Sequence, residues 1–236
     1  KRSGAKEIIP VLPYYPYARG DKKDLNRGPI GAKIIAQMLE INGATGVITF
    51  ELHASQIEGF FKIPVIHIEG KSLFSNVFSE YNENMVFCAP DAGAGKRVEH
   101  LIDTVKGKYD HSIPYVIINK TRKEANVVDK MVLIGDVKGK DVYIYDDMGD
   151  TCGTVIKATE TLLSEGAKSV NVMLSHALFS GINTMSNLDK SRIDKIYISD
   201  SLGEKTGDKI ITLSCGELIG KAILSFVGNK SYEELI

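Results

Sequence analysis

One stretch of the chain gathers side chains that can bind a phosphate group. It reads DVYIYDDMGDTCGTVIKA over residues 141–158, an apolar run that ends in two adjacent acids and continues through a turn into a helical pattern. Gly149 and Gly153 permit a tight turn with inward-facing backbone N–H groups, and the first turn of a helix binds phosphate through such groups and its dipole. The hydroxyls of Thr151 and Thr154 can donate to the same phosphate oxygens.

The acids of this stretch raise a separate question. Asp150 or Thr151 alone would cap the following helix, which is the simplest interpretation of the turn. A cap does not explain Asp146 and Asp147, which end an apolar run where unpaired charge is costly. Two carboxylates at that position can accept hydrogen bonds from sugar hydroxyls or hold a hydrated Mg²⁺.

Two cations and a histidine follow other strand-like runs. Lys120 and Arg122 in NKTRKE are two residues apart, so an extended segment points both toward one phosphate chain. A solvated charged loop is the simpler alternative. His53 follows the run GVITF, and a neutral imidazole can bind a metal ion or nucleotide phosphates, although a single histidine is more often structural.

A glycine-rich turn is a further candidate. APDAGAGKR places Asp91 at the end of a strand-like run, and Gly93 and Gly95 would let the backbone approach a diphosphate. A plain turn from strand to helix would have the same sequence pattern. The basic loops YARGDKK and NRGPI add Arg19, Asp21 and Arg27, which an ordinary surface loop would also explain.

Alternating strands and helices must position these residues. The apolar runs predict strands over residues 7–14, 46–52, 63–68, 84–91, 114–120, 130–137, 140–147, 169–176, 195–201 and 209–214. Helical spacing predicts helices over residues 29–43, 71–83, 95–105, 153–167 and 216–228. We expect 130–137 to open a short hairpin into 140–147. Ligands of such sheets bind where the strands end, which is where the candidate residues stand.

Most of these strands are continuously apolar, which indicates parallel sheets covered on both faces and hence an α/β fold. We expect one domain over residues 1–69, with three strands and one long helix, and a second over 70–214. The final helix and tail, 215–236, can pack on either. The first domain is thin for its class, and the chain begins without methionine, so we expect a missing N-terminal portion.

Composition excludes some partners. The 236 residues carry a formal net charge of −1, which gives no electrostatic reason to bind nucleic acid or a membrane surface. No apolar run approaches the roughly 20 residues of a membrane span. Cys88, Cys152 and Cys215 are too far apart in sequence for a common metal-binding spacing, so we expect reduced thiols and a cytoplasmic location.

The stretch at 141–158 resembles the ribose-phosphate signature shared by phosphoribosyltransferases and phosphoribosyl pyrophosphate synthetases. Other segments resemble the second family, ribose-phosphate diphosphokinase, in its order and over nearly all of the chain. These segments are LPYYPYARGDKK, PIGAKIIAQMLEINGA, ELHASQIEGFFKIPV, APDAGAGKR, NKTRKEANVVDKMVLIGDV and SHALFSG. The sequence of these segments is most like that of eukaryotic members of the family.

The resemblance implies a fold and an activity. It implies two phosphoribosyltransferase-like domains, each a parallel sheet flanked by helices, with the first domain truncated. The implied reaction transfers the diphosphoryl group of ATP to the 1-hydroxyl of ribose 5-phosphate, giving phosphoribosyl pyrophosphate and AMP for nucleotide biosynthesis. It also implies Mg²⁺ as cofactor and a homo-oligomer built from dimers, possibly a hexamer.

The resemblance also implies a role for each candidate residue. The implied catalytic residues are Lys120 and Arg122, and the implied metal ligands are His53 and Asp91. Arg19, Asp21, Arg27 and His53 would bind ATP. Asp91, Gly93 and Gly95 would form the diphosphate loop. The ribose 5-phosphate site would consist of Asp146, Asp147, Asp150, Thr151, Cys152, Gly153 and Thr154.

The chain departs from the family pattern at a few positions. Glu51 stands where the family usually has aspartate, and Gly20 stands where it has a glutamine of the ATP site. The tail NKSYEELI also differs. Gly20 and the expected missing portion favour a second hypothesis, a catalytically weak regulatory subunit of a synthetase complex. A phosphoribosyltransferase is a third, although no segment is typical of its base-binding hood.

Overall fold

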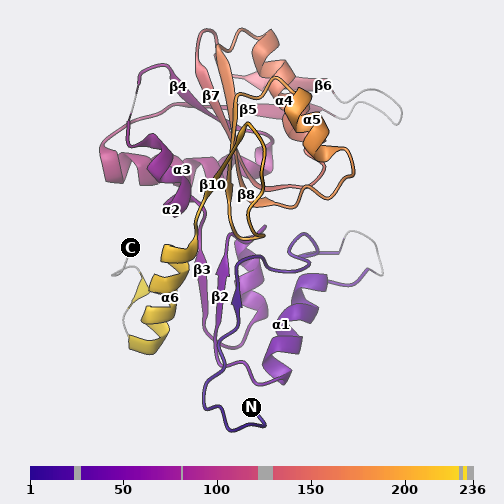
Figure 1. Cartoon of the computed structure of the whole chain (residues 1–236), viewed down its shortest axis with the longest axis vertical. Coiled ribbons are helices and arrows are strands. Elements are labelled where there is room, and N and C mark those ends of the chain that lie inside the picture. The colour runs from indigo at the N-terminus through magenta and orange to yellow at the C-terminus, as the bar shows by residue number, and fades with distance from the viewer. Residues whose placement is uncertain (24–27, 81, 122–129, 229–230, 233–236) are drawn as a thin grey trace. The chain divides into compact units, whose positions relative to one another are not determined.

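The computed structural model of the chain describes residues 1–23, 28–80, 82–121, 130–228 and 231–232 (Figure 1). The chain divides into two compact units. The first consists of Lys1–Gly70 together with Ser214–Ile236, and the second of Lys71–Leu213. The final helix therefore belongs to the first unit.

The first unit contains a parallel sheet in the order β1–β2–β3. The strands are β1 (Val11–Leu12), β2 (Val47–Phe50) and β3 (Val65–Ile68). The strand predicted over residues 7–14 shrinks to β1 because Pro10 and Pro13 on either side have no N–H to donate. Its helices are α1 (Gly31–Ile41), the 3₁₀ helix η1 (Ser55–Phe60) and α6 (Gly216–Gly228), and α6 packs on β2 and β3.

The second unit contains a sheet in the order β10–β9–β8–β7–β4–β5–β6. All neighbouring pairs are parallel except β5 with β6. The strands are β4 (Met85–Ala89), β5 (Tyr115–Thr121), β6 (Lys130–Ile134), β7 (Asp141–Gly149), β8 (Ser169–Ala177), β9 (Lys195–Ser199) and β10 (Ile210–Leu213). The predicted α/β architecture, parallel sheets flanked by helices, is confirmed.

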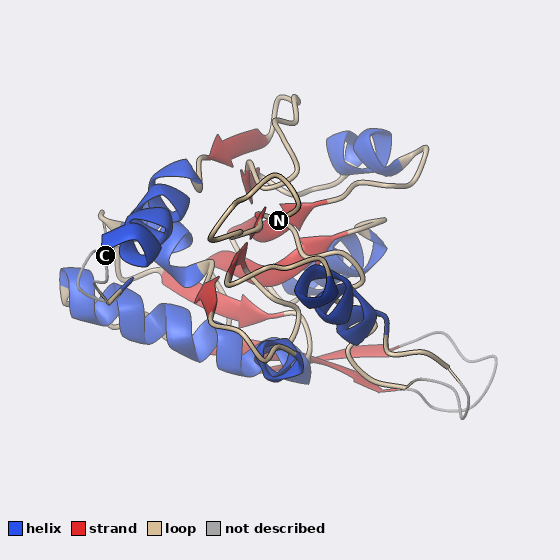
Figure 2. Ribbon diagram, turned by 90° about the horizontal axis from the view of Figure 1, so that it is seen from below, coloured by secondary structure: helices blue, strands red, loops and turns tan. Residues whose placement is uncertain are grey.

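Helices cover both faces of this second sheet (Figure 2). One face packs against α2 (Lys71–Phe74), the 3₁₀ helix η2 (Ser75–Phe78) and α3 (Gly95–Tyr109), which follows the short 3₁₀ helix η3 (Ala92–Ala94). The other packs against α4 (Gly153–Ser164) and α5 (Thr184–Lys190). The single helix predicted over 71–83 is thus wrong, since α2 gives way to η2. The sequence analysis did not predict α5.

The predicted hairpin between residues 130–137 and 140–147 is also wrong. β6 pairs with β5 in antiparallel orientation, and β7 lies between β4 and β8 in the middle of the sheet. The exposure of the side chains on β6 and β7 explains the positions of these strands in the sheet. Val132 and Ile134 of β6 are 42% and 56% exposed, which suits an edge strand, whereas every residue of β7 is buried or half-buried, which suits a strand with neighbours on both sides.

The three cysteines are free thiols, and each is buried. None of the helices in the described part of the chain is long and apolar enough to cross a membrane.

Candidate active site

The turn between β7 and α4 combines a left-handed backbone conformation with very close packing. Cys152 adopts the left-handed conformation, with φ of 59°, and its side chain is 5% exposed. A Cβ added to Gly149 would lie 2.6 Å from Cδ1 of Leu174 and 3.0 Å from Sγ of Cys152. Those distances are below or at the edge of normal contact, so the close packing of the turn requires glycine at 149.

The start of α4 has the features of a phosphate-binding helix terminus. Its N-cap residue, Cys152, makes no side-chain capping hydrogen bond, and N–H groups of a first helical turn can bind an anion. Thr151, Gly153 and Thr154 are all exposed there. The arrangement suits a phosphate group held by backbone N–H groups and two hydroxyls.

The acid pair at the end of β7 faces a cation that the sequence analysis did not single out. Nη1 of Arg97 lies 3.6 Å from Oδ1 of Asp146 and 3.7 Å from Oδ1 of Asp147. Asp147 is 4% exposed, and its backbone N–H donates to Oδ1 of Asp146 over 2.9 Å. Burial, together with the neighbouring charge of Asp147, raises the pKa of Asp146 from 3.8 to about 8, and Arg97 opposes the shift.

The register of the sheet brings the glycine-rich turn to the same edge. Cys88 of β4 pairs with Ile144 of β7, and Asp91 and Asp147 each stand three residues beyond that pair. Oδ1 of Asp91 accepts a hydrogen bond of 3.1 Å from the N–H of Ala94 and so caps η3. Arg97 lies in the first turn of α3, directly after this capped turn. The motif APDAGAGKR therefore supplies both the turn and the cation.

A further segment, just after β8, packs on the turn between β7 and α4. The N–H of Phe179 donates to the carbonyl of Gly149 over 3.0 Å, and Oγ of Ser180 donates to Oδ1 of Asp150. Gly181 follows them, and a Cβ added there would lie 3.8 Å from Cγ2 of Thr151. The sequence analysis quoted this segment, SHALFSG, only as part of the resemblance and assigned it no role.

The first unit holds the other candidates. His53 follows β2 after Glu51, which has a positive φ of 40° and is 5% exposed. Arg19 is exposed and Asp21 half-buried in the loop before α1. That loop is closed by the N–H of Gly20, which donates to the carbonyl of Tyr17 over 2.8 Å. His53 and Asp91, the two predicted metal ligands, thus belong to different units.

Some predicted residues cannot be placed. Arg27 and Arg122 lie outside the described residues. Lys120 belongs by its backbone to β5, where it pairs with Met131 of β6, but its side chain is outside the described part of the structure. The structure therefore brings Arg97 to the acid pair and places Asp91 at the same edge of the sheet as residues 146–154. The side chains of the two predicted catalytic cations lie outside the described residues.

The residues present could bind Mg²⁺ only together with substrate phosphates and water. Among the described residues, no three His, Cys, Asp or Glu side chains gather closely enough to hold a metal ion alone. Mg²⁺ often binds through one or two carboxylates, substrate phosphates and water. Asp91 fits that manner, because its carboxylate, oriented by the hydrogen bond from Ala94, stands at a strand end beside a glycine-rich turn.

The fold and this turn define an α/β protein with a strand-to-helix turn suited to a phosphate group. Two family models match the chain. The N-terminal domain of ribose phosphate pyrophosphokinase matches residues 1–43, and the phosphoribosyl synthetase-associated domain matches residues 103–236. A crystal structure of phosphoribosylpyrophosphate synthetase from Mycobacterium smegmatis is similar, with a TM-score of 0.87 and 33% identity, over 97% of this chain and 74% of that one.

Comparison with curated relatives indicates the same family. Ribose-phosphate pyrophosphokinase 2 of Saccharomyces cerevisiae is 42% identical over 86% of this chain and 62% of its own length. The ribose-phosphate pyrophosphokinase of Wolinella succinogenes is 40% identical over 100% of this chain and 74% of its own length. The chain belongs to the ribose-phosphate pyrophosphokinase family. It spans about three fifths of the length of the yeast relatives it matches.

Proposed function

We propose that the protein transfers the diphosphoryl group of ATP to the 1-hydroxyl of ribose 5-phosphate, giving phosphoribosyl pyrophosphate and AMP. The observation that carries this proposal is the joint geometry of one sheet edge. There, a helix start suited to phosphate lies next to an acid pair suited to sugar hydroxyls, and Arg97 faces that pair. Family membership supports the same reaction.

The ribose 5-phosphate site assigns a task to each part of the turn. The first turn of α4, with Thr151 and Thr154, would hold the 5-phosphate. Asp146 and Asp147 would accept hydrogen bonds from the ribose 2- and 3-hydroxyls. Because these carboxylates are half-buried or buried, they would hold the sugar in one orientation with its 1-hydroxyl presented for reaction.

The transfer itself requires alignment and charge neutralisation more than covalent chemistry. The 1-hydroxyl oxygen forms a bond to the β-phosphorus of ATP, and the bond from that phosphorus to the oxygen bridging the α-phosphate breaks. AMP leaves with the bridging oxygen, and the hydroxyl proton passes to solvent. Lys120 and Arg122 are proposed to stabilise the charge that develops on the transferred group.

Mg²⁺ is the proposed cofactor, and when bound it would neutralise phosphate oxygens of the nucleotide. Asp91 and His53 are its proposed ligands, and Gly93 and Gly95 would let the backbone approach the diphosphate. Arg19, Asp21 and Arg27 are proposed to contact ATP. The proposal also includes a cytoplasmic homo-oligomer built from dimers, with neither nucleic acid nor membrane as partner.

Measuring AMP tests the reaction directly. The purified chain is incubated with ATP, Mg²⁺ and ribose 5-phosphate, and a sample without the sugar phosphate serves as background. We expect sugar-dependent AMP, which Asp147→Asn should abolish and Asp103→Asn, an exposed change on α3, should leave intact. AMP formation that is the same with and without ribose 5-phosphate contradicts the proposal. Ribose 5-phosphate binding without AMP would instead support a regulatory subunit.

A further inference from the structure

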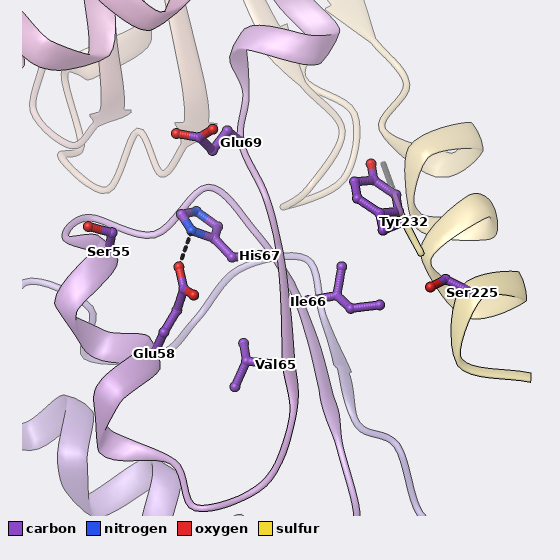
Figure 3. Close-up of a pocket in the computed structure, with 8 residues that line it drawn as sticks. All are labelled: Ser55, Glu58, Val65, Ile66, His67, Glu69, Ser225 and Tyr232. Atoms are coloured by element: carbon purple, nitrogen blue, oxygen red, sulfur yellow. Dashed lines mark hydrogen bonds and ion pairs between the residues drawn. The ribbon is translucent and has the colours of Figure 1, made fainter. Parts of the chain in front are cut away.

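A histidine in the first unit bonds to both flanks of the segment that carries His53. His67, on β3, lines a cavity of about 350 Å³ together with Ser55, Glu58, Val65, Ile66, Glu69, Ser225 and Tyr232 (Figure 3). Its Nε2 accepts a hydrogen bond of 3.0 Å from the backbone N–H of Leu52. Its Nδ1 lies 2.8 Å from Oε1 of Glu58, as the dashed line in Figure 3 marks.

These two bonds fix the tautomer of the ring. A backbone N–H can only donate, so Nε2 must carry a lone pair toward Leu52. The neutral imidazole then has its proton on Nδ1, which donates to the carboxylate of Glu58. Both ring nitrogens are engaged in this way, and the side chain is 10% exposed. His67 therefore acts within the fold and does not itself present a lone pair to a ligand.

The bonds close a short loop around His53. Leu52 immediately precedes His53, and Glu58 belongs to η1, which begins two residues after it. One imidazole on β3 thus holds the chain before and after His53. Leu52 is also 3% exposed and packs in the core cluster with Tyr15 and Ile57, so the segment is anchored by packing as well.

The start of this segment needs such anchors. Glu51 has a φ of 40°, a left-handed conformation that a non-glycine residue keeps only when its surroundings determine it. Its N–H donates to the carbonyl of Ile68 over 2.8 Å, and its Oε2 accepts from the N–H of Gly70 over 2.5 Å. Together with the bond to Leu52, these contacts tie the turn to β3 and the residues just after it.

We propose that His67 is a positioning residue for His53, with its tautomer set by Glu58. The proposal rests on the proposed function, in which His53 contacts the magnesium-bound nucleotide. Without the Nε2 acceptor, the N–H of Leu52 loses its partner, and the strained turn at Glu51 can relax. The side chain of His53 then samples several positions, and the ordering that nucleotide binding requires becomes more costly.

The test separates positioning from general stability. His67→Leu removes both bonds, whereas His67→Gln keeps an oxygen that can accept from Leu52. Val65→Ala is the matched control, because Val65 lies on the same face of β3 and lines the same cavity with a side chain that cannot hydrogen-bond. Calorimetry on the full chain measures affinity for α,β-methylene-ATP with Mg²⁺, which cannot be cleaved at that bridge, and separately for ribose 5-phosphate.

We expect His67→Leu to weaken binding of the nucleotide analogue by about tenfold or more, with ribose 5-phosphate affinity unchanged. His67→Gln should recover most of that loss, and Val65→Ala should change neither affinity. Two-bond nitrogen correlations in NMR should show an unprotonated Nε2 in the parent chain. A protonated Nε2, or equal losses in His67→Leu and Val65→Ala, would overturn the proposal.

The outcomes also separate this proposal from the proposed function. A parent chain that forms sugar-dependent AMP, with His67→Leu indistinguishable from it, defeats the positioning role alone. A parent chain that neither forms AMP nor binds the nucleotide analogue defeats both, since a positioning role then has no ligand to serve.

Discussion

The guanidinium group of Arg97 faces both acids at the end of β7, with Nη1 3.6 Å from Oδ1 of Asp146 and 3.7 Å from Oδ1 of Asp147. The acids lie 49 and 50 residues after the arginine in sequence. The contact links the glycine-rich turn after β4 to the proposed sugar site after β7. It also balances part of the charge that makes this site costly to bury.

Replacing Arg97 by methionine should weaken ribose 5-phosphate binding. The change keeps much of the buried aliphatic stem but removes the positive charge that opposes the raised pKa of Asp146. The acid pair would then ionise less readily and accept hydrogen bonds from sugar hydroxyls less well. We expect affinity to fall by about tenfold or more, which corresponds to about 1.4 kcal/mol, as measured by calorimetry with ribose 5-phosphate.

Lys96 provides the control for that change. Lys96→Met removes a positive charge from the neighbouring, exposed position of α3, so it reports the effect of net charge alone. Arg97→Lys should recover part of the affinity. If Arg97→Met and Lys96→Met bind the sugar phosphate equally well, the guanidinium has no role in the site.

Asp146 should make stability depend on pH. Burial raises its pKa to about 8 in the folded chain, whereas it ionises near 3.8 in the unfolded chain. The folded state therefore binds more protons between these values, and its stability falls as pH rises. The contribution of Asp146 is fully present below about pH 3.8 and is lost above about pH 8.

Thermal unfolding of Asp146→Asn and the parent chain from pH 4.5 to 8.5 measures this effect. The variant cannot ionise, so its unfolding temperature relative to the parent should climb with pH and level off above about pH 8. Asp103→Asn, on the exposed side of α3, serves as a comparison for the loss of a surface carboxylate. A difference between Asp146→Asn and the parent that stays constant over the whole range would show that this carboxyl is not perturbed.

Local sequence patterns were enough to locate the strand ends and the turn from residue 146 to 154, because the strands are continuously apolar and the turn is contiguous. Contacts that depend on register were not predictable. Arg97 meets Asp146 only because β4 pairs with β7, and Ser180 meets Asp150 only because β8 follows on the other side. The position of β6 was missed for the same reason, since an apolar run does not indicate which strand it pairs with.

Gly149→Ala should destabilise the second unit and disorder the turn. A Cβ at this position would lie 2.6 Å from Cδ1 of Leu174, which is 1% exposed and cannot withdraw without disturbing the core. Overpacking of this kind costs about 1–3 kcal/mol. Denaturant unfolding monitored on the full chain should show the loss, and ribose 5-phosphate affinity should fall with it.

Gly107→Ala is the matched comparison for that substitution. Gly107 lies within α3, and a Cβ there would meet nothing within 4 Å, so alanine should stabilise the helix by about 0.5–1 kcal/mol. Equal effects of the two substitutions on unfolding would mean that the turn can accommodate a side chain at 149.

Ser180→Ala should impair the turn between β7 and α4 from outside it. Oγ of Ser180 donates to Oδ1 of Asp150, and this bond joins the segment after β8 to the turn proposed to hold the phosphate. Losing this exposed bond should free Asp150 to move. We expect a several-fold rise in KM for ribose 5-phosphate with a smaller change in kcat. Ser164→Ala, which removes an exposed hydroxyl at the far end of α4, should change neither constant, and a matching rise in KM there would exclude a specific role for Ser180.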